Sequence, residues 1–184
     1  MSAYQNPANY PTQAVPNNGH GSDRMLGLTL GAGTVCLGLI AGFFFDWATS
    51  IMPSLAEADD RTYVIVMQKT ITTINSSPLF MLALMGAFVF TIVAAILQNR
   101  IGAKAAFRWT LAGLALYVVA VGITMGVHFP LNDTLEKAGD PDTIDLAALR
   151  ADTEDAWVAG HLARTGAAVL GLAFLCRALW LRRR

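Results

Sequence analysis

Four long apolar runs alternate with polar connections along the chain. They cover about residues 25–45, 79–97, 107–127 and 156–180. Each run holds about 20 residues, and a helix of about 20 residues crosses a hydrocarbon core of roughly 30 Å. The pattern therefore predicts an all-α fold, an integral membrane four-helix bundle.

The first run carries two features of membrane helices. Glycines at positions 27, 31, 38 and 42 form two pairs of small residues spaced four apart, which allow close helix approach. Aromatic residues 43–45 and Trp47 close the run around Asp46. Aromatic side chains are enriched where a span meets the headgroups, so we expect this cluster at the membrane interface.

Residues 48–77 form the first long connection, and part of it has a helical repeat. The apolar positions of this repeat are Val64, Met67, Ile71 and Ile74. Asp59 or Asp60 can cap the start of such a helix. The connection therefore predicts an amphipathic helix in the first outer loop, lying near the headgroups or folded back over the bundle. Pro53, before it, is expected to break the first long helix.

The second long connection, about 130–155, is strongly acidic and is expected to hold a short helix near residues 145–151. Residues 98–108 form a short basic connection. Residues 1–24 are rich in proline, asparagine and glycine and have almost no aliphatic side chains. We expect a disordered N-terminal tail over residues 1–24, followed by one membrane domain over residues 25–184.

Composition supports the membrane assignment. Hydrophobic residues make up 54% of the chain, charged residues make up 14%, and the mean hydropathy is +0.47. Soluble domains carry roughly 25% charged residues. Because the formal net charge is zero, the composition gives no reason to expect a nucleic-acid partner. The partner that composition leads us to expect is the lipid bilayer.

The distribution of charge predicts the orientation of the chain in the membrane. Eight of the 13 basic residues lie at the two ends of the chain or in the 98–108 connection, and 12 of the 13 acidic residues lie on the other side. These basic residues are Arg24, Arg100, Lys104, Arg108, Arg177 and Arg182–Arg184. Basic loops stay in the cytoplasm, so we expect a multi-pass protein of the plasma membrane with both termini cytoplasmic.

The start of the fourth run carries the first candidate site residues. Trp157, His161 and Arg164 are spaced i, i+4 and i+7, so they share one helix face. Arg164 lies about two turns inside the helix, where an unpaired charge is costly and indicates function. The alternative is that Arg164 pairs with a carboxylate, such as Asp46 or Asp133, and only holds the helices together.

The outer end of the third run carries further polar residues. His128 is followed by Pro130, which is expected to end the helix, and by Asn132 and Asp133 in the turn. Turn chemistry alone explains Asn and Asp there, but it does not explain the histidine beside them. Two histidines near one membrane surface suit either an interfacial or a functional role.

The amphipathic helix adds Gln68 and Asn75. They are seven residues apart, so they share a helix face and are expected to cover or line the same polar pocket.

An ordered set of short motifs resembles the anthrone oxygenase-like family of small four-helix integral membrane proteins. The motifs are Gly42-Phe43-Phe44, Met52-Pro53, Met67-Gln68, Pro78 with Phe80, Pro130-Leu131-Asn132-Asp133 with Leu135, Asp140-Pro141, and Trp157 through Arg164. The resemblance implies oxidation of anthrones to anthraquinones with molecular oxygen, without an obvious cofactor.

The candidate residues fit such chemistry. His161 or His128 could take a proton from an activated CH₂ group, and Arg164 and Asn132 could hold the resulting enolate. Trp157 could stack on the planar aromatic small molecule that the resemblance implies as a partner. The remaining substrate-binding candidates are Asp133, Gln68 and Asn75.

Two alternatives stay open. Imidazoles from two helices can bind haem or copper inside a bundle, and His128 and His161 could do so with Asp133 as a third ligand. The chain lacks closely spaced ligand pairs, so no metal is the first expectation. The other alternative is a non-catalytic membrane protein that binds a small molecule or assists assembly.

Overall fold

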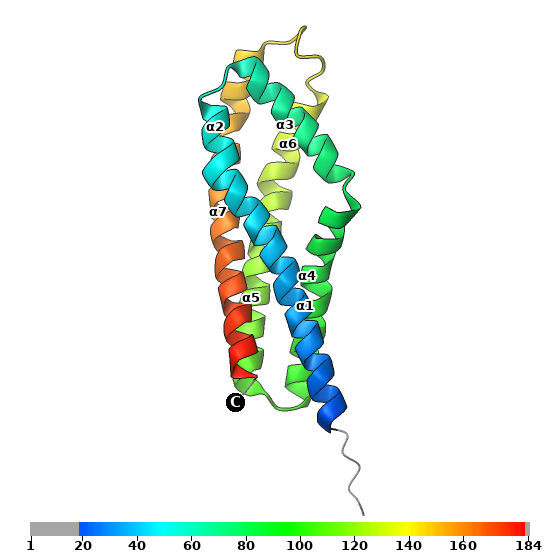
Figure 1. The fold of residues 1–184 in the computed structure, drawn as a ribbon. Coiled ribbons are helices and arrows are strands. Elements are labelled where there is room, and N and C mark those ends of the chain that lie inside the picture. The colour runs from blue at the N-terminus through cyan, green and yellow to red at the C-terminus, as the bar shows by residue number, and fades with distance from the viewer. Residues whose placement is uncertain (1–18, 183–184) are drawn as a thin grey trace, which may run out of the picture.

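The computed structural model describes residues 19–182, which are helical or in turns and contain no β-strand. Four long helical rods, apolar enough to cross a membrane, run up and down side by side (Figure 1). They are Asp23–Ala56, Pro78–Arg100, Lys104–Lys137 and Leu146–Leu181. The predicted all-α membrane bundle is confirmed, and the chain is a multi-pass membrane protein. Most of the predicted N-terminal tail lies outside the described residues, but residues 19–24 are helical, not part of a tail.

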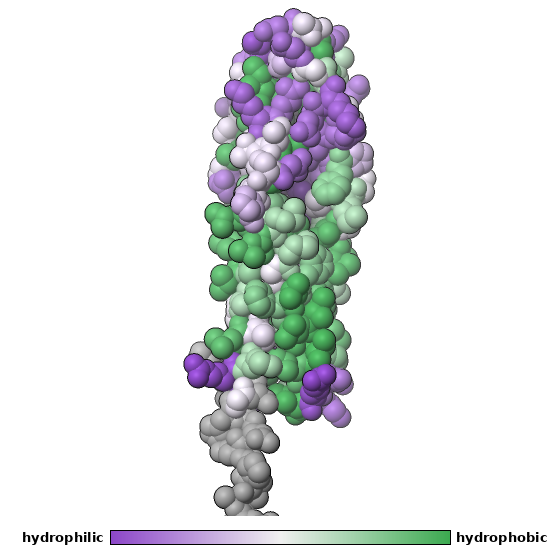
Figure 2. Space-filling view, turned by 90° about the vertical axis from the view of Figure 1, so that its right-hand side faces the viewer, coloured by the Kyte–Doolittle hydropathy of each residue, from purple (hydrophilic) through white to green (hydrophobic). Residues whose placement is uncertain are grey.

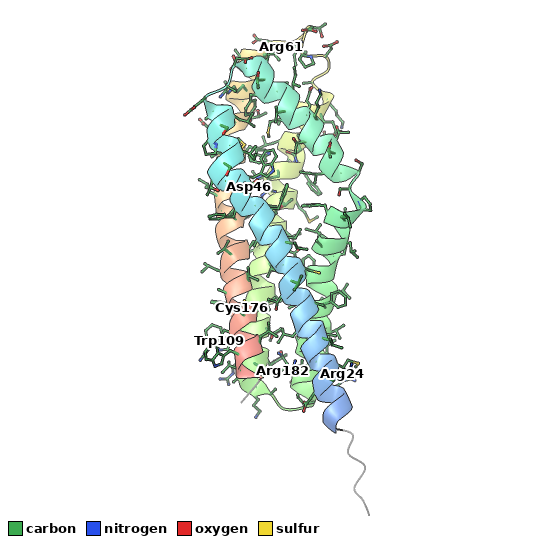
Figure 3. All side chains as sticks on the ribbon, viewed as in Figure 1. Arg24, Asp46, Arg61, Trp109, Cys176 and Arg182 are labelled. Atoms are coloured by element: carbon green, nitrogen blue, oxygen red, sulfur yellow. The ribbon has the colours of Figure 1, made fainter. Side chains whose placement is uncertain are left out.

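The bundle has two different ends. At the turn end, residues 101–103 join the second rod to the third, and the first rod starts and the fourth rod ends (Figure 1). The loop end, opposite, carries the two long connections. Arg24 and Arg182 lie at the turn end and Arg61 at the loop end (Figure 3). Figure 2 shows a hydrophobic belt over the lower part of the molecule and hydrophilic residues gathered at the loop end.

Prolines do not end the first and third rods, contrary to the prediction from sequence. Each rod instead contains one wide π-helical turn, and the proline follows two residues after it. The first rod consists of α1 (Gly19–Asp46), η2 (Trp47–Ile51) and α2 (Met52–Ala56). The third consists of α5 (Lys104–Ile123), η3 (Thr124–His128) and α6 (Phe129–Lys137).

The π turns explain how the rods continue past Pro53 and Pro130. The Met52 N–H donates to the Trp47 carbonyl, and the Phe129 N–H donates to the Thr124 carbonyl, both five residues back. A proline in an ordinary helix clashes with the carbonyl four residues earlier. The wider turn leaves room for the ring, and each proline occupies the first turn of the next α-helix, where its missing N–H costs little.

Glycines set the closest helix contacts, but they are not the glycines predicted. A Cβ on Gly113 of α5 would lie 3.0 Å from the carbonyl oxygen of Gly171 in α7 (Leu146–Leu181), and the reciprocal distance is 3.1 Å. Gly33 of α1 similarly faces a backbone nitrogen of α4 (Pro78–Arg100) at 3.1 Å. Gly31 and Gly42 face open space. Gly38 faces Leu172 of α7 at an ordinary 3.8 Å and Gly27 faces the Arg182 side chain, so none of the four predicted glycines brings two backbones together.

The predicted amphipathic helix is α3 (Asp60–Asn75), and it folds back over the loop end against α6 and α7. Asp59 caps it by accepting from the Thr62 N–H at 3.0 Å, and hydrogen bonds from Thr62 hold the Asp59 pKa below its usual value. Its buried residues are Tyr63, Val64, Met67 and Ile71. Burial raises the pKa of Tyr63 to about 12, so the ring packs as the neutral phenol.

The fourth rod is one helix, α7, and the short helix expected near residues 145–151 is its first part. Asp145 caps it by accepting from the Ala148 N–H at 3.0 Å. Arg150, in this first part, ties α7 to the first rod. It donates to the carbonyls of Leu55, Ala56 and Ala58 and pairs with Asp60 and Glu154. These hydrogen bonds and ion pairs of Arg150 hold the end of α2 and the start of α3 against α7.

Candidate functional site

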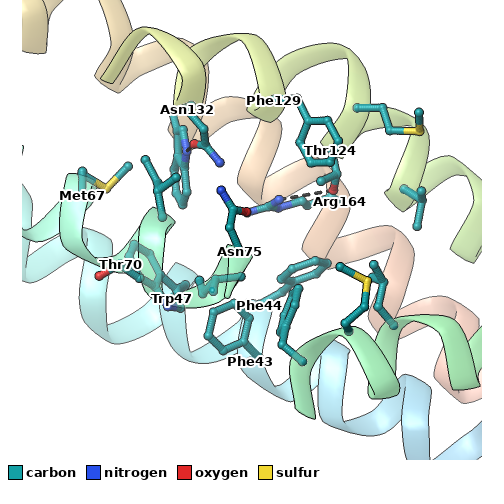
Figure 4. Close-up of a pocket in the computed structure, with 18 of the residues that line it drawn as sticks. Phe43, Phe44, Trp47, Met67, Thr70, Asn75, Thr124, Phe129, Asn132 and Arg164 are labelled. Carbon is teal, nitrogen blue, oxygen red and sulfur yellow. Dashed lines mark hydrogen bonds between the residues drawn. The ribbon is translucent and has the colours of Figure 1, made fainter. Parts of the chain in front are cut away.

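A cavity of about 320 Å³ lies beneath α3, at the level of the two π turns. Both π turns contact α7. Most of the wall is apolar or aromatic, and its polar side chains are Thr70, Asn75, Tyr117, Thr124, Asn132 and Arg164. The apolar lining includes Phe43, Phe44, Trp47, Met67, Ile71, Phe80, Met81, Leu84, Val121, Met125, Phe129 and Trp157 (Figure 4).

Arg164 is the only charged residue of this wall, and it is 7% exposed. Its Nη1 donates to the Thr124 Oγ1 at 3.2 Å (Figure 4). Its guanidinium carbon lies 4.4 Å from the centre of the Phe44 ring and 5.4 Å from that of Trp157. Within residues 19–182 no carboxylate oxygen lies within 4.0 Å of the guanidinium. The alternative in which Arg164 clamps a carboxylate is therefore wrong.

His161 holds the guanidinium in place. Its Nδ1 accepts from the Arg164 Nε at 3.1 Å and lies 2.9 Å from Nη2. A guanidinium can only donate, so Nδ1 is the acceptor and the imidazole is the neutral tautomer protonated at Nε2. That Nε2 donates to the Phe44 carbonyl at 2.8 Å. The ring stacks on Trp157 with centroids 4.8 Å apart and an interplanar angle of 11°.

Three of the five guanidinium N–H groups of Arg164 thus have partners. The other two have no hydrogen-bond partner among residues 19–182.

Asn132 is oriented by Trp157. The indole Nε1 donates to the Asn132 Oδ1 at 2.9 Å, which turns the amide nitrogen of Asn132 toward the cavity. Figure 4 shows the side chains of Asn132, Asn75 and Arg164 pointing toward one another. The cavity therefore combines one cation, two amide groups and flat aromatic walls.

Comparison with known proteins gives the family. A family model described as anthrone oxygenase matches residues 76–174, more than half of the chain. The chain belongs to the anthrone oxygenase family. The match runs from the end of α3 into α7, so it includes Asn132, Trp157, His161 and Arg164. The part of the cavity wall formed by α1, η2 and α3 lies outside the match. No curated protein and no solved structure matches the chain.

His128 of this anthrone oxygenase family member is fully buried, and it does not line the cavity. Its ring lies edge-on to Trp157, with centroids 5.0 Å apart, and its centroid is 6.1 Å from that of His161. Neither ring nitrogen has a hydrogen-bond partner. The sequence placed this histidine at the outer end of a helix, but the π turn carries it into the interior.

Two predicted substrate-binding residues lie away from the cavity. Gln68 donates to the carbonyls of Leu135 at 2.9 Å and Gly139 at 3.1 Å, so it joins α3 to the end of α6. Asp133 is exposed and pairs with Lys137 at 2.7 Å. Positions seven apart share a helix face but lie about 10 Å apart along the axis, which explains why Asn75 reaches the cavity and Gln68 does not.

The histidines also bear on the haem or copper alternative. Both ring nitrogens of His161 already have partners, so only His128 has nitrogens left for a metal. Among residues 19–182 no three His, Cys, Asp or Glu side chains are grouped as a metal site.

Sequence reasoning missed three residues of the family member's site: Phe44, Trp47 and Thr124. Phe44 and Trp47 were expected at the membrane interface, but both are buried and line the cavity. Thr124 begins the second π turn. The sequence feature that could have indicated them is a proline within each of two long helices, Pro53 and Pro130. A helix that continues past a proline can contain a π turn, and π turns often occur at functional sites.

Proposed function

We propose that this protein oxidises a planar aromatic ketone of the anthrone type with molecular oxygen in the cavity beneath α3. Arg164 and Asn132 hold the substrate as its enolate. The observation that carries the proposal is a buried arginine in the cavity wall that has two unused N–H donors and no carboxylate partner within the described part of the chain.

An uncompensated cation in an apolar wall favours an anionic ligand. Electrostatic interactions are stronger there than in water, and donors held in place cost no reorganisation when charge develops. An anthrone has a CH₂ group that loses a proton to give an aromatic enolate. In this proposal Arg164 and the amide nitrogen of Asn132 bind the enolate oxygen, and this binding promotes the ionisation.

The reaction balances without a further reactant. The CH₂ carbon loses a proton, and the resulting carbanion bonds to one oxygen atom of O₂. The peroxide anion takes up a proton, and the hydroperoxide then loses water as its O–O bond breaks. The net change converts the CH₂ group and O₂ into a carbonyl group and water. The protein supplies binding, orientation and charge stabilisation.

The histidines have supporting roles in this proposal. His161 already uses both nitrogens, so it positions Arg164 and does not act as the base. The cavity wall contains neither histidine nor carboxylate, so the substrate proton passes to water as the substrate binds. Turnover should therefore rise with pH until the substrate is fully ionised.

The cavity volume and walls suit a polycyclic ligand. Small-molecule pockets commonly measure about 300–1,000 Å³ and are mainly apolar with a few polar groups. The cavity lies at the lower end of that range, at about 320 Å³. Phe44, Trp47 and Trp157 provide flat surfaces against which fused rings can pack.

Turnover of an anthrone by purified protein in lipid nanodiscs tests the proposal. Formation of the quinone is followed by absorbance and oxygen uptake by an electrode. Arg164→Gln should lower kcat/KM at least about 100-fold, the size expected for loss of a charge-stabilising donor. Arg164→Lys keeps the positive charge but loses the planar, two-pronged arrangement of donors. Its kcat/KM should lie between that of the wild type and that of Arg164→Gln.

Arg61→Gln is the matched control, because Arg61 is an exposed arginine paired with Asp142 at 2.8 Å. Thermal melting checks that each variant is folded. A folded Arg164→Gln variant that keeps wild-type turnover contradicts the proposal. Tight binding of the anthrone without any turnover would identify a non-catalytic binding protein instead.

We also propose that the loop end faces away from the cytoplasm, because the turn end carries most of the basic residues. Cysteines introduced at the exposed positions Asp142 and Lys104 test this in intact cells. An impermeant thiol reagent should label Asp142→Cys and not Lys104→Cys. The reverse pattern contradicts the orientation.

A further inference from the structure

Three apolar residues that line the cavity are also exposed on the outer surface of the bundle. Met81 of α4 is 47% exposed, Met125 of η3 is 60% exposed, and Phe129 of α6 is 56% exposed. An apolar residue that is both lining and exposed marks the edge of an opening. The cavity therefore opens sideways, between the start of α4 and the third rod at its π turn.

The packing of the helices agrees with this opening. α4 packs closely against α1 and α5, but it has no comparable contact with η3 or α6. At the loop end the cavity is covered by α3, which Gln68 ties to the Leu135 and Gly139 carbonyls. The cavity is thus closed beneath α3, and it is open between the start of α4 and the third rod, with exposed Asn75 at the upper edge of the opening.

The opening lies at the depth of the hydrocarbon. Met125 and Phe129 continue the exposed apolar surface that includes Val118 on α5. The next exposed turn carries Asp133, whose ion pair with Lys137 marks the polar boundary. Leu82, beside Met81, is 66% exposed. The rim is therefore apolar along Met81, Met125 and Phe129, where it faces lipid tails, and the exposed Asn75 forms its polar edge toward the loop end.

We propose that the ligand of this cavity reaches it from the bilayer, through a lateral opening bordered by Met81, Met125 and Phe129. The ligand class is an uncharged, lipid-soluble polycyclic aromatic that ionises only after it reaches Arg164. The nature of the ligand rests on the proposed function. The route does not, because it follows from the position of the opening alone.

A photoreactive aromatic probe dissolved in the bilayer tests the route without any turnover. Protein in lipid nanodiscs containing benzophenone is irradiated, and the labelled residues are located by mass spectrometry. Label is expected on buried wall residues such as Phe44 and Trp157, besides the label on lipid-facing residues. Met81→Trp/Met125→Trp should reduce the label inside the cavity at least about fivefold by narrowing the opening.

Leu82→Trp and Val118→Trp are the controls, since both positions face lipid and neither lines the cavity. They should leave the label inside the cavity unchanged. Absence of label on Phe44 and Trp157 in the wild-type protein overturns the lateral route, as does equal labelling in the narrowed variant. Labelling without anthrone turnover leaves the route standing and counts against the proposed function alone.

Discussion

The two halves of the bundle use the same kind of helix differently. In the half near the turn end, regular α-helices approach closely at Gly113 and Gly171, and side chains such as Leu30 and Leu175 are fully buried. In the half near the loop end, two rods widen into π turns and the core contains a cavity of about 320 Å³. The hollow at the turn end is a groove on the surface between α4 and α5, whereas the hollow at the loop end lies inside the bundle.

The difference shows how a membrane bundle can hold a charged group without exposing it to lipid. A regular helix pair leaves no space for a guanidinium beside its core. In the half near the loop end, Arg164 has the His161 and Thr124 hydrogen bonds and two aromatic rings around it. Because these partners are neutral, the positive charge of Arg164 remains available to an anion. A carboxylate partner would have neutralised that charge.

The largest expected effect in the half near the loop end, after loss of Arg164 itself, comes from His161. His161→Ala removes the acceptor that orients the guanidinium and should lower kcat/KM for an anthrone about 100-fold, or ~2.7 kcal/mol. Glutamine can accept from Arg164 and donate to the Phe44 carbonyl, so His161→Gln should stay within about tenfold of wild type. Steady-state kinetics over a range of pH measures both.

If His161 only positions Arg164, the dependence of kcat/KM on pH should have the same shape in His161→Gln as in the wild type. If that variant is as inactive as His161→Ala and the profile loses an inflection, His161 acts as the base and the assigned role is wrong.

An intermediate effect is expected in the half near the turn end. Gly113→Val places side-chain atoms against the Gly171 carbonyl and should destabilise the bundle by roughly 1–3 kcal/mol. Thermal melting in detergent measures this loss. Gly31→Val is the matched control, because a Cβ at Gly31 meets nothing within 4 Å. Equal melting temperatures for the two variants would show that the close contact does not stabilise the bundle.

The smallest effect is expected at Asp133, which the sequence assigned to the site. Its exposed ion pair with Lys137 spans one helical turn, and such pairs contribute about 0.3–0.5 kcal/mol. Asp133→Asn should therefore change anthrone turnover by less than about twofold and leave the melting temperature almost unchanged. A tenfold loss of turnover in Asp133→Asn would show that Asp133 takes part in the reaction.

Most of the fold could be predicted because it depends on periodicity. Four apolar runs of membrane length predicted four rods, and the helical repeat of the first connection predicted the buried face of α3. Spacing also placed Trp157, His161 and Arg164 on one face, and all three are buried together. These features follow from local sequence and from the length scale of the membrane.

The details of the site could not be predicted because they depend on the π turns. The usual effect of proline predicts a helix end at Pro53 and at Pro130, and this rule placed His128 at the membrane surface. The interfacial preference of aromatic residues placed Trp47 there. One wide turn before each proline keeps the rod continuous and changes which side chains face inward. The partner of Arg164 was also out of reach, because it depends on a tertiary contact with Thr124.

The central claim is that the positive charge of Arg164 selects an anionic aromatic ligand, and the ionisation of a bound ligand tests it most directly. 2-Hydroxyanthraquinone is flat, is already oxidised, and changes colour when its hydroxyl ionises. Its visible spectrum is recorded with wild-type protein and with Arg164→Gln, at a pH where the free compound is neutral. The account predicts the spectrum of the anion when it is bound to wild-type protein and that of the neutral form with the variant. A neutral spectrum with the wild-type protein, or an anionic one with both proteins, contradicts it.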